Sequence, residues 1–465
     1  MQQKEYGREG GNKLINLIEF MKGAITKMFN KNDVIQNIGV KPELSTTMAS
    51  KMEDWRRMLK GKAQWVEGPV KSLKLESAIC QEFANIVLNE MECRVSNEKL
   101  DKLIQSVIDD LNENLQEAFA IGAFVIKPLG QDSVEFIAQD KYIPLKFYNK
   151  KIVDILFFDK KIYSNYYYTR VERHTLDERG LTIENRAFRS NNEGELGREI
   201  PLDVFDDWAK LPQVITYRGV TQMDFGYYRN PIFNKIDGSP CGISVFDDCI
   251  DDIERADKQM AGLDWEFESG ERAVHVDNIA LRSTPEILPG GKQRQVVPKL
   301  NERLYKGLNL QAGNNTELFK EYSPEFRDQS ILNGFNAYLR RIEFNACLSY
   351  GDLSDVQFID KTATEAKIAK KRKYNRVTAI QKNLKTCLED LTYALAFYNA
   401  MLHRGYELIC NFNDSILVDD EVDRDNDRKD LANGTYRPEE YRSKWRGETL
   451  EEAEKNLPEQ ADVLE

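Results

Sequence analysis

The stretch FIDKTATEAKIAKKRK, Phe358 to Lys373, opens the longest predicted helix of the chain. Thr362 and Glu365 have the T-x-x-E spacing of a capping box, in which both side chains bond backbone N–H groups at the start of a helix. Apolar residues then recur at helical spacing, and Gly405 is placed to end the helix. About forty residues at 1.5 Å each predict a rod of roughly 60 Å. Such a rod indicates a layered, elongated or multi-subunit architecture. Its apolar seam is Val377, Ile380, Leu384, Leu388, Leu391, Leu395, Tyr398 and Leu402.

The same stretch begins a basic run in a chain that is acidic overall. Eight lysines and arginines lie between Lys367 and Lys385 with no acid among them, whereas the whole chain carries a net charge of −12. One interpretation is a solvated helix face or a contact with acidic helices of another subunit. The other is non-specific contact with a nucleic-acid backbone. The residues singled out for either contact are Lys367, Lys370, Lys371, Arg372 and Lys373.

Composition limits the class of protein. The length of 465 residues suggests roughly two to four domains, and the 41% hydrophobic content is typical of a folded chain. The acidic balance argues against a protein coated by DNA over its whole surface. Seven scattered cysteines without a CxxC pair predict free, mostly buried thiols in a reduced compartment. No apolar stretch of about eighteen residues and no signal peptide are found, so we expect a cytosolic origin and no membrane partner.

The order of predicted elements indicates an α+β fold that is mainly helical. Helical patterns run from residue 13 to residue 116, and β-rich segments separated by turns follow between Ala123 and Ser190. A helix near 244–268 leads into a compact insertion with short strands, and a further helix is expected to start at Ser323 and Pro324. The seam of the first of these helices is Phe246, Ile250, Ile253, Ala256, Met260, Leu263 and Phe267.

Motifs that suggest catalysis or metal binding fail at decisive positions. The loop PGGKQ at 289–293 resembles a phosphate-binding loop, but Glu286 replaces the earlier glycine and Gln293 the Mg²⁺-binding Ser or Thr. The acidic run from Asp423 resembles a calcium loop, but Arg428 replaces its turn glycine. We therefore predict no catalytic residue, no metal site and no cofactor. The three histidines, which are far apart in the sequence, are His174, His275 and His403.

Aspartates on the 244–268 helix leave one enzymatic alternative open. Asp247 and Asp251 share a helix face at i,i+4, as do Asp248 and Asp252. Such pairs are compatible with a two-metal site of a DNA-processing enzyme such as a metal-dependent nuclease. No histidine or strand-borne carboxylate accompanies them, which favours a charged face lining water. A capsid adaptor protein that forms no ring is a further alternative.

The order of parts resembles the portal proteins of tailed bacteriophages, particularly siphovirus-type phages of Gram-positive hosts. MEDWRRMLKGKAQWV (52–66) resembles the early helix before the wing of that family. GISVFDDCIDDIERADKQMAGLDWEFESGERAVHVD (242–277) resembles its entry into stem and clip. DKTATEAK (360–367) resembles the K-T-A-T-E turn where the tunnel loop gives way to the long helix, and RKDLANGTYRPEEY (428–441) resembles the crown. The resemblance covers most of the chain from Met48 to Leu457.

This resemblance implies a portal fold with wing, stem, clip and crown regions, in a ring of about twelve subunits. The implied domains are N-terminal helices and β-rich wing (1–240), stem helix 1 (241–270), clip (271–322), stem helix 2 (323–349), tunnel loop (350–361), long wing helix (362–405), and wing strand with crown and tail (406–465).

The resemblance also implies a conduit for genome packaging and ejection at one capsid vertex. The protein is then expected in the virion after assembly in the host cytoplasm. Its implied partners are copies of itself, double-stranded DNA, the terminase large subunit, a head-completion or adaptor protein, and major capsid and scaffold proteins. Tunnel-loop residues expected to project toward DNA are Asp352, Ser354, Asp355, Gln357 and Lys361. Clip-loop residues are Lys292, Arg294 and Lys299.

Overall fold

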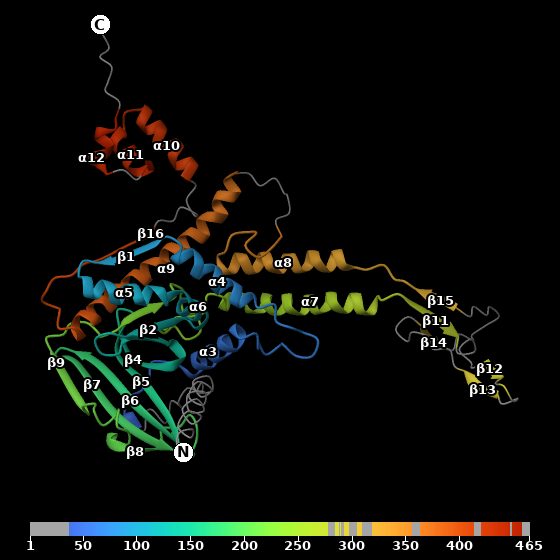
Figure 1. Cartoon of the computed structure of the whole chain (residues 1–465), viewed down its shortest axis with the longest axis horizontal. Helices are drawn as coiled ribbons and strands as arrows, with labels where there is room; N and C mark the ends of the chain where they lie inside the picture. The colour runs from blue at the N-terminus through green and yellow to red at the C-terminus, as the bar shows by residue number, and fades with distance from the viewer. Residues whose placement is uncertain are drawn as a thin grey trace, which may run out of the picture. The chain divides into compact units, whose positions relative to one another are not determined.

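A computed structural model describes residues 37–277, 284–287, 289, 293–296, 305–308, 319–355, 363–412, 420–446 and 449–457. It contains 43% helix and 23% strand, which confirms the α+β class (Figure 1). The chain divides into two compact units. Unit 1 comprises Met1–Glu53, Ile79–Val245 and Asp360–Glu465, and unit 2 comprises Asp54–Ala78 and Phe246–Ile359. The first part of the predicted helical region, from residue 13 to residue 36, lies outside the described residues.

A twisted antiparallel sheet forms the β-rich part of unit 1. Its strands follow the order β4-β5-β6-β7-β8, and β9 also pairs with β7. Asn149 and Lys150 turn β4 into β5, and Ser164 and Asn165 turn β5 into β6. All four residues have positive φ, which is the backbone of a two-residue type I′ hairpin. The strands are β4 (Tyr142–Tyr148), β5 (Lys151–Tyr163), β6 (Tyr166–Asp177), β7 (Gly180–Ser190), β8 (Arg198–Ile200) and β9 (Val214–Arg218).

A second sheet of unit 1 contains a crossing of two backbone segments. Strands β10 (Gly226–Arg229), β2 (Ala123–Pro128) and β3 (Val134–Ala138) form it, in that order. A Cβ on Gly122 would lie 2.2 Å from the carbonyl oxygen of Gly242, so both positions require glycine. The buried amide of Gln139 bonds the N–H and the carbonyl of Gly242. The stretch GISVF, residues 242–246, therefore begins at a close contact between two backbone segments.

Helix α9 (Ala363–Tyr398) is the long helix predicted from the sequence, and its seam is confirmed from Val377 to Leu395. It packs against β10 and β2 (Figure 1). The helix ends before the predicted Gly405, because Ala400 adopts positive φ and the N–H of Met401 bonds the carbonyl of Ala396. The other helices with residues in unit 1 include α3 (Thr46–Leu59), α4 (Leu75–Leu88), α5 (Glu98–Asp109) and α6 (Leu111–Ile121).

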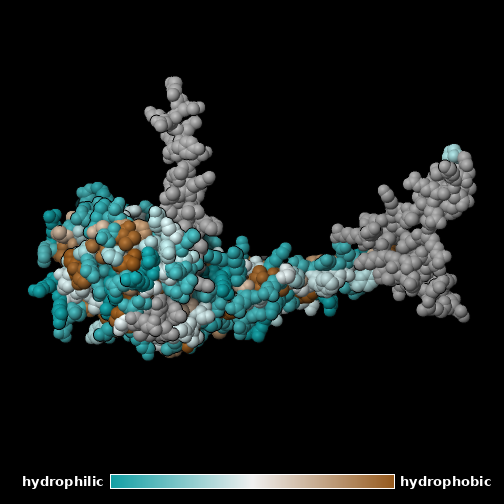
Figure 2. All heavy atoms as spheres, turned by 90° about the horizontal axis from the view of Figure 1, so that it is seen from below, coloured by the Kyte–Doolittle hydropathy of each residue, from teal (hydrophilic) through white to brown (hydrophobic). Residues whose placement is uncertain are grey.

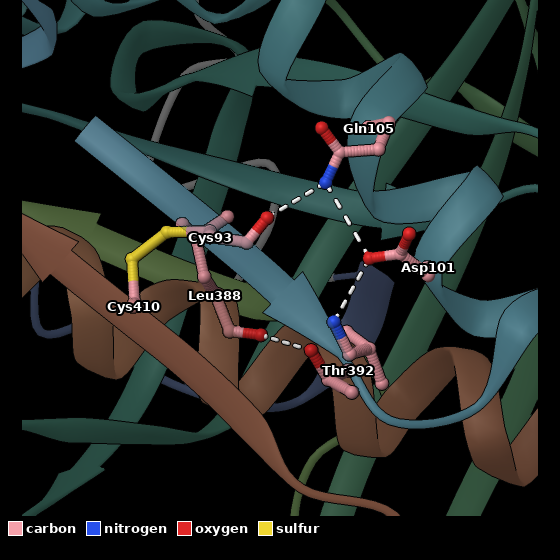
Figure 3. The surroundings of a disulfide bond; sticks show 7 residues. Cys93, Asp101, Gln105, Leu388, Thr392 and Cys410 are labelled. Carbon is pink, nitrogen blue, oxygen red and sulfur yellow. Dashed lines mark hydrogen bonds between the residues drawn. A yellow bond between two sulfur atoms is a disulfide. The ribbon is translucent and has the colours of Figure 1, made fainter. Parts of the chain in front are cut away.

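Strands distant in the sequence meet at a disulfide. β1 (Met91–Val95) pairs antiparallel with β16 (Leu408–Phe412), and this register places Cys93 opposite Cys410 with their Cα atoms 4.1 Å apart (Figure 3). The expectation of free thiols was therefore wrong for this pair, because cross-strand register is not visible in cysteine spacing. The free cysteines, as expected mostly buried, are Cys80, Cys241, Cys249, Cys347 and Cys387.

Unit 2 contains two helices that flank short strands in the sequence. α7 (Ile250–Ser269) and α8 (Asp328–Ala346) lie side by side and run antiparallel (Figure 1). The predicted start of α8 at Ser323 was wrong. The helix begins at Asp328, because Arg327 precedes it as N-cap and its N–H and guanidinium bond Glu266. The strands are β11 (Ala273–Asp277), β14 (Tyr305–Leu308) and β15 (Phe319–Tyr322) in one sheet, and β12 (Thr284–Ile287) and β13 (Gln293–Val296) in another.

The predicted apolar seam of α7 is confirmed only at its N-terminal half. Ile253 and Ala256 are buried, whereas Phe267 is 46% exposed. Acidic side chains occupy buried positions instead, among them Asp252 and Asp257. The helix is therefore held by polar contacts as well as by apolar ones.

The charged C-terminal segment forms short helices, as predicted. α10 (Asp420–Ala432) and α11 (Pro438–Arg446) are joined through Asp427, whose carboxylate accepts hydrogen bonds from Lys444 and Trp445. α12 (Leu450–Lys455) follows. Among all the described helices, none combines the length and the apolarity needed to cross a bilayer.

Candidate functional site

The loop at residues 347–355, which includes the described part (350–355) of the predicted tunnel loop, follows helix α8 directly. Cys347 adopts the left-handed conformation with φ 64° and ends the helix. Its N–H donates to the carbonyls of Glu343 and Phe344, and the N–H of Leu348 donates to the carbonyl of Glu343 at 2.9 Å. This pattern satisfies the last helical carbonyls and turns the chain sharply.

A single buried carboxylate organises this loop. Glu343 has no exposed surface. Its Oε1 accepts the N–H groups of Gly351 (3.0 Å), Leu353 (2.7 Å) and Ser354 (2.8 Å), and its Oε2 accepts the Ser354 hydroxyl (2.8 Å). Hydrogen bonds to a charged acceptor are among the stronger ones in proteins. Glu343 therefore fixes the loop backbone to α8.

Two further contacts tie the loop ends. The side chain of Asn336 accepts the N–H of Asp355 at 3.0 Å and donates to its carboxylate at 3.3 Å. The carboxylate of Asp352 accepts the N–H of Ser349 at 2.8 Å. The loop is thus held at its start, its middle and its end.

These contacts change the expectation for the predicted tunnel-loop residues. Ser354 is buried and serves the anchoring by Glu343, so the prediction that its side chain projects was wrong. Asp352 and Asp355 are exposed. Gln357 and Lys361 lie outside the described residues.

The basic run at the start of α9 separates into two kinds of residue. Lys371 is exposed, whereas the Lys373 side chain is only 7% exposed and its Nζ lies 2.9 Å from Glu82 Oε1. Lys373 therefore forms an internal ion pair, and its prediction as an external contact was wrong. It lies four residues before Val377, so extending the apolar seam backward places it on the buried face. Arg372 is half-buried, and the structure does not describe the side chains of Lys367 and Lys370.

The aspartates of α7 and its preceding turn also have structural partners. Asp247 accepts the indole N–H of Trp55 at 3.0 Å. The Asp252 carboxylate lies 3.2 Å from Arg341 and accepts a hydrogen bond from Asn345. The distances along the sequence, about ninety residues or more, hid these partners from sequence reasoning.

In the described part of the chain, no group of three or more His, Cys, Asp or Glu side chains is arranged to hold a metal ion. Of the predicted clip-loop residues, Arg294 lies in β13, and Lys292 and Lys299 fall outside the described residues.

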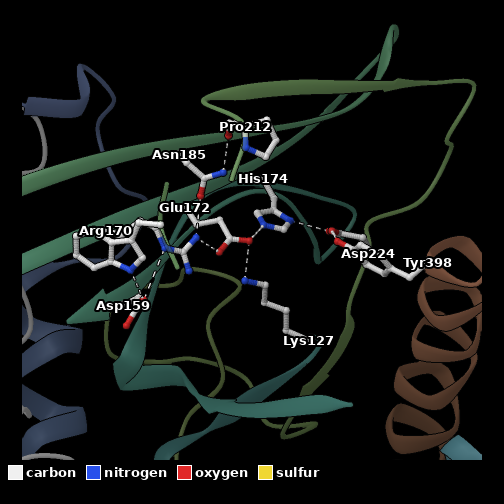
Figure 4. A network of polar contacts seen from close by, with 10 residues as sticks. Lys127, Asp159, Arg170, Glu172, His174, Asn185, Pro212, Asp224 and Tyr398 are labelled. Carbon is white, nitrogen blue, oxygen red and sulfur yellow. Dashed lines mark hydrogen bonds and ion pairs between the residues drawn. The ribbon is translucent and has the colours of Figure 1, made fainter. Parts of the chain in front are cut away.

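A buried polar network lies within the β-rich part of unit 1 (Figure 4). The ring nitrogens of His174 lie 2.8 Å from Asp224 and 2.7 Å from Glu172. Glu172 also bonds Lys127 at 2.7 Å, and Tyr398 of α9 donates to Asp224 at 2.6 Å. Both ring nitrogens face carboxylate oxygens, which is the environment of an imidazolium.

The charges of this network support each other. Burial lowers the pKa of His174, but Asp224 and Glu172 outweigh burial and raise it above its usual value. Burial raises the pKa of Glu172, but Lys127, His174 and Arg170 hold it well below its usual range. Each of these charged groups lies beside a group of opposite charge, which allows them to stay ionised in the interior of unit 1.

Exposed side chains on α7 and α8 recur at helical spacing. Trp265 of α7 is 64% exposed and Phe344 of α8 is 52% exposed. Apolar residues interrupt the mostly hydrophilic surface (Figure 2). The exposed stripe of α7 comprises Asp251, Arg255, Lys258, Gly262, Trp265 and Ser269, and that of α8 comprises Ser330, Asn333, Ala337, Arg341 and Phe344.

No family model matches the chain. No match was found among curated proteins either.

Proposed function

We propose that this chain is the subunit of a phage portal, a ring-forming conduit for genome packaging and ejection. The observation that carries the proposal is the order of α7, a small β-sheet, α8, an anchored loop and the 36-residue helix α9. That order matches the stem, clip, second stem helix, tunnel loop and long helix that the sequence resemblance implies.

The exposed stripes of α7 and α8 support contact between neighbouring subunits. Residues three and four positions apart lie on one face of a helix, so each stripe presents a continuous surface to solvent. Aromatic residues are enriched at protein–protein interfaces, and Trp265 and Phe344 are large exposed aromatic residues. Gly262 and Ala337 are small residues on the same stripes.

The acidic side chains of the loop after α8 are compatible with a DNA duplex that moves past them without being bound. Each phosphate bound by Lys or Arg adds salt-dependent affinity, so a passage for moving DNA is best served by few basic contacts. The exposed side chains of Asp352 and Asp355 are acidic and repel phosphate. Anchoring by Glu343 gives this part of the loop a firm base.

The proposal includes the partners of a portal. We assign the region of β11 to β15 to docking of the terminase large subunit and later of a head-completion or adaptor protein. Double-stranded DNA passes without sequence recognition, and major capsid and scaffold proteins surround the ring at the capsid vertex.

Negative-stain microscopy and mass photometry of the purified chain test the proposal. The expected particle is a ring of about twelve 53.8-kDa subunits. Replacing Trp265 with Ala should shift particles toward single chains, and replacing the exposed Tyr148 of unit 1 with Ala is the matched control. Single chains under all conditions would overturn the proposal, as would metal-dependent DNA cleavage that is lost in Asp251→Asn.

A further inference from the structure

The segment between α3 and α4, residues 60–74, has no regular secondary structure and is fastened to α7 by one carboxylate. We call it the 60–74 strap. The indole N–H of Trp65 donates to Asp257 Oδ2 at 2.8 Å, and the backbone N–H of Leu73 donates to Asp257 Oδ1 at 2.9 Å. Asp257 is buried. The two oxygens of one side chain therefore hold the strap at Trp65 and at Leu73.

Glu76 lies three residues beyond Leu73, in the first turn of α4, and it is completely buried. Within the described part of the chain, no other residue donates a hydrogen bond to either of its carboxyl oxygens. A buried ionised carboxylate without partners is costly, so such a group takes up a proton instead. Burial raises the pKa of Glu76 to about 7, outweighing the backbone N–H of Glu76 itself, which favours the ionised form, and the charge of Asp257 adds a smaller rise.

We propose that Glu76 and Asp257 form a proton-dependent latch that fastens the 60–74 strap to helix α7. With Glu76 protonated, Asp257 is the one negative charge of the pair and keeps its two N–H donors. When Glu76 releases its proton to solvent, a second negative charge is buried close to Asp257. Opening of the strap then hydrates both carboxylates and relieves their repulsion.

Among the described residues, Asp257 of α7 is the charged side chain whose influence on Glu76 stands out, and it has the same sign of charge as ionised Glu76. On α4 itself, Glu82 is engaged with Lys373. The charged side chains of the strap are exposed to solvent, which screens them. They are Lys60, Lys62, Glu67, Lys71 and Lys74.

The sign of the pH dependence follows from the direction of the pKa change. The closed strap binds a proton that the open strap releases between the usual pKa of 4.5 and the raised pKa of about 7. Closing is therefore favoured below this window and weakened as pH rises through it. Between pH 5.5 and pH 8.5 the opening equilibrium is expected to rise roughly 30-fold. This inference does not depend on the proposed ring.

Hydrogen–deuterium exchange of the full-length chain tests the latch. Exchange of strap peptides that contain the Leu73 amide is measured at pH 5.5 and pH 8.5 and corrected for the intrinsic pH dependence of exchange. We expect the opening of wild-type strap to rise roughly 30-fold, whereas Glu76→Gln, which mimics the protonated side chain, should change less than about threefold. Glu67→Gln, an exposed carboxylate in the strap, should behave as wild type.

Equal strap opening at both pH values in the wild-type chain would overturn the latch, whether or not any variant folds. A full pH response in Glu76→Gln would overturn it as well. A response confined to the strap peptides, and abolished by Glu76→Gln alone, supports it.

Discussion

Two buried glutamates in unit 2 have the same exposure and opposite surroundings. Glu343 accepts four hydrogen bonds from the loop after α8, whereas no other described residue donates one to the Glu76 carboxyl group. Both are completely buried. The comparison teaches that burial alone does not decide what a carboxylate does. Hydrogen-bond donors stabilise the ionised carboxylate, which can then hold a loop in place. Without such donors, burial raises the pKa of the carboxyl group, so that its charge depends on pH.

The largest effect is expected from removing the satisfied carboxylate. Glu343→Ala leaves three N–H groups and one hydroxyl without their acceptor, and each buried orphan costs about 1–3 kcal/mol. We expect the loop to lose about 4 kcal/mol of local stability. Native-state hydrogen exchange of Leu353 and Ser354 measures this loss. The control is Glu325→Ala, an exposed site ahead of α8. Equal exchange in Glu343→Ala and Glu325→Ala would contradict the conclusion that Glu343 anchors the loop.

In the network around His174, the carboxylates of Asp224 and Glu172 are bonded by an imidazole that itself titrates. His174→Gln removes the charge shared by Asp224 and Glu172, and we expect a loss of about 3 kcal/mol at pH 6. Because the folded-state pKa of His174 is raised, its contribution is complete below about pH 6.5 and disappears as pH rises through the folded-state pKa. Denaturant unfolding at pH 6 and pH 9 should therefore show a smaller difference at the higher pH. If the loss of unfolding free energy were the same at both pH values, the imidazole of His174 would stabilise the fold by packing alone.

A double-mutant cycle measures the interaction between Glu76 and Asp257. Glu76→Gln and Asp257→Asn are combined, and the coupling free energy is measured by denaturant unfolding. Repulsion between the two carboxylates predicts a coupling of about 1–2 kcal/mol at pH 8 and almost none at pH 5. Additive effects at both pH values would show that the two residues do not interact.

The smallest effect concerns the two lysines of α9. Lys373→Met breaks the ion pair with Glu82, which is 39% exposed, so we expect a loss of about 1 kcal/mol. Lys371→Met changes an exposed residue and should alter stability by less than about 0.5 kcal/mol. Thermal unfolding of both variants compares them directly. A greater loss in Lys371→Met would reverse the assignment of buried and exposed faces.

Periodicity predicted the helices well because apolar burial repeats with the helical turn. The seam of α9 from Val377 to Leu395 shows this directly. It predicted α7 less well, since buried acids such as Asp252 and Asp257 interrupt the apolar pattern. Their partners are a guanidinium on α8 and an indole in the strap, and no local spacing predicts either contact.

The sequence predicted where the loop after α8 lies, but not the hydrogen bonds that hold it. Sequence placed a loop after α8, and residues 347–355 form one. The role of Glu343 was missed, because a glutamate inside a helix resembles any solvated surface residue until the chain folds back on it. Capping and turn rules cannot anticipate a helix side chain that bonds backbone eight to eleven residues later.

The crossing of Gly122 and Gly242 has an evolutionary consequence. Adding a methyl group at either position places it within about 2.2 Å of the other's carbonyl oxygen. No compensating replacement exists at the opposite site, since glycine has no side chain to shorten. A related sequence can replace either glycine only if the two backbone segments move apart. Sequences that keep this chain path are therefore expected to keep glycine at both positions.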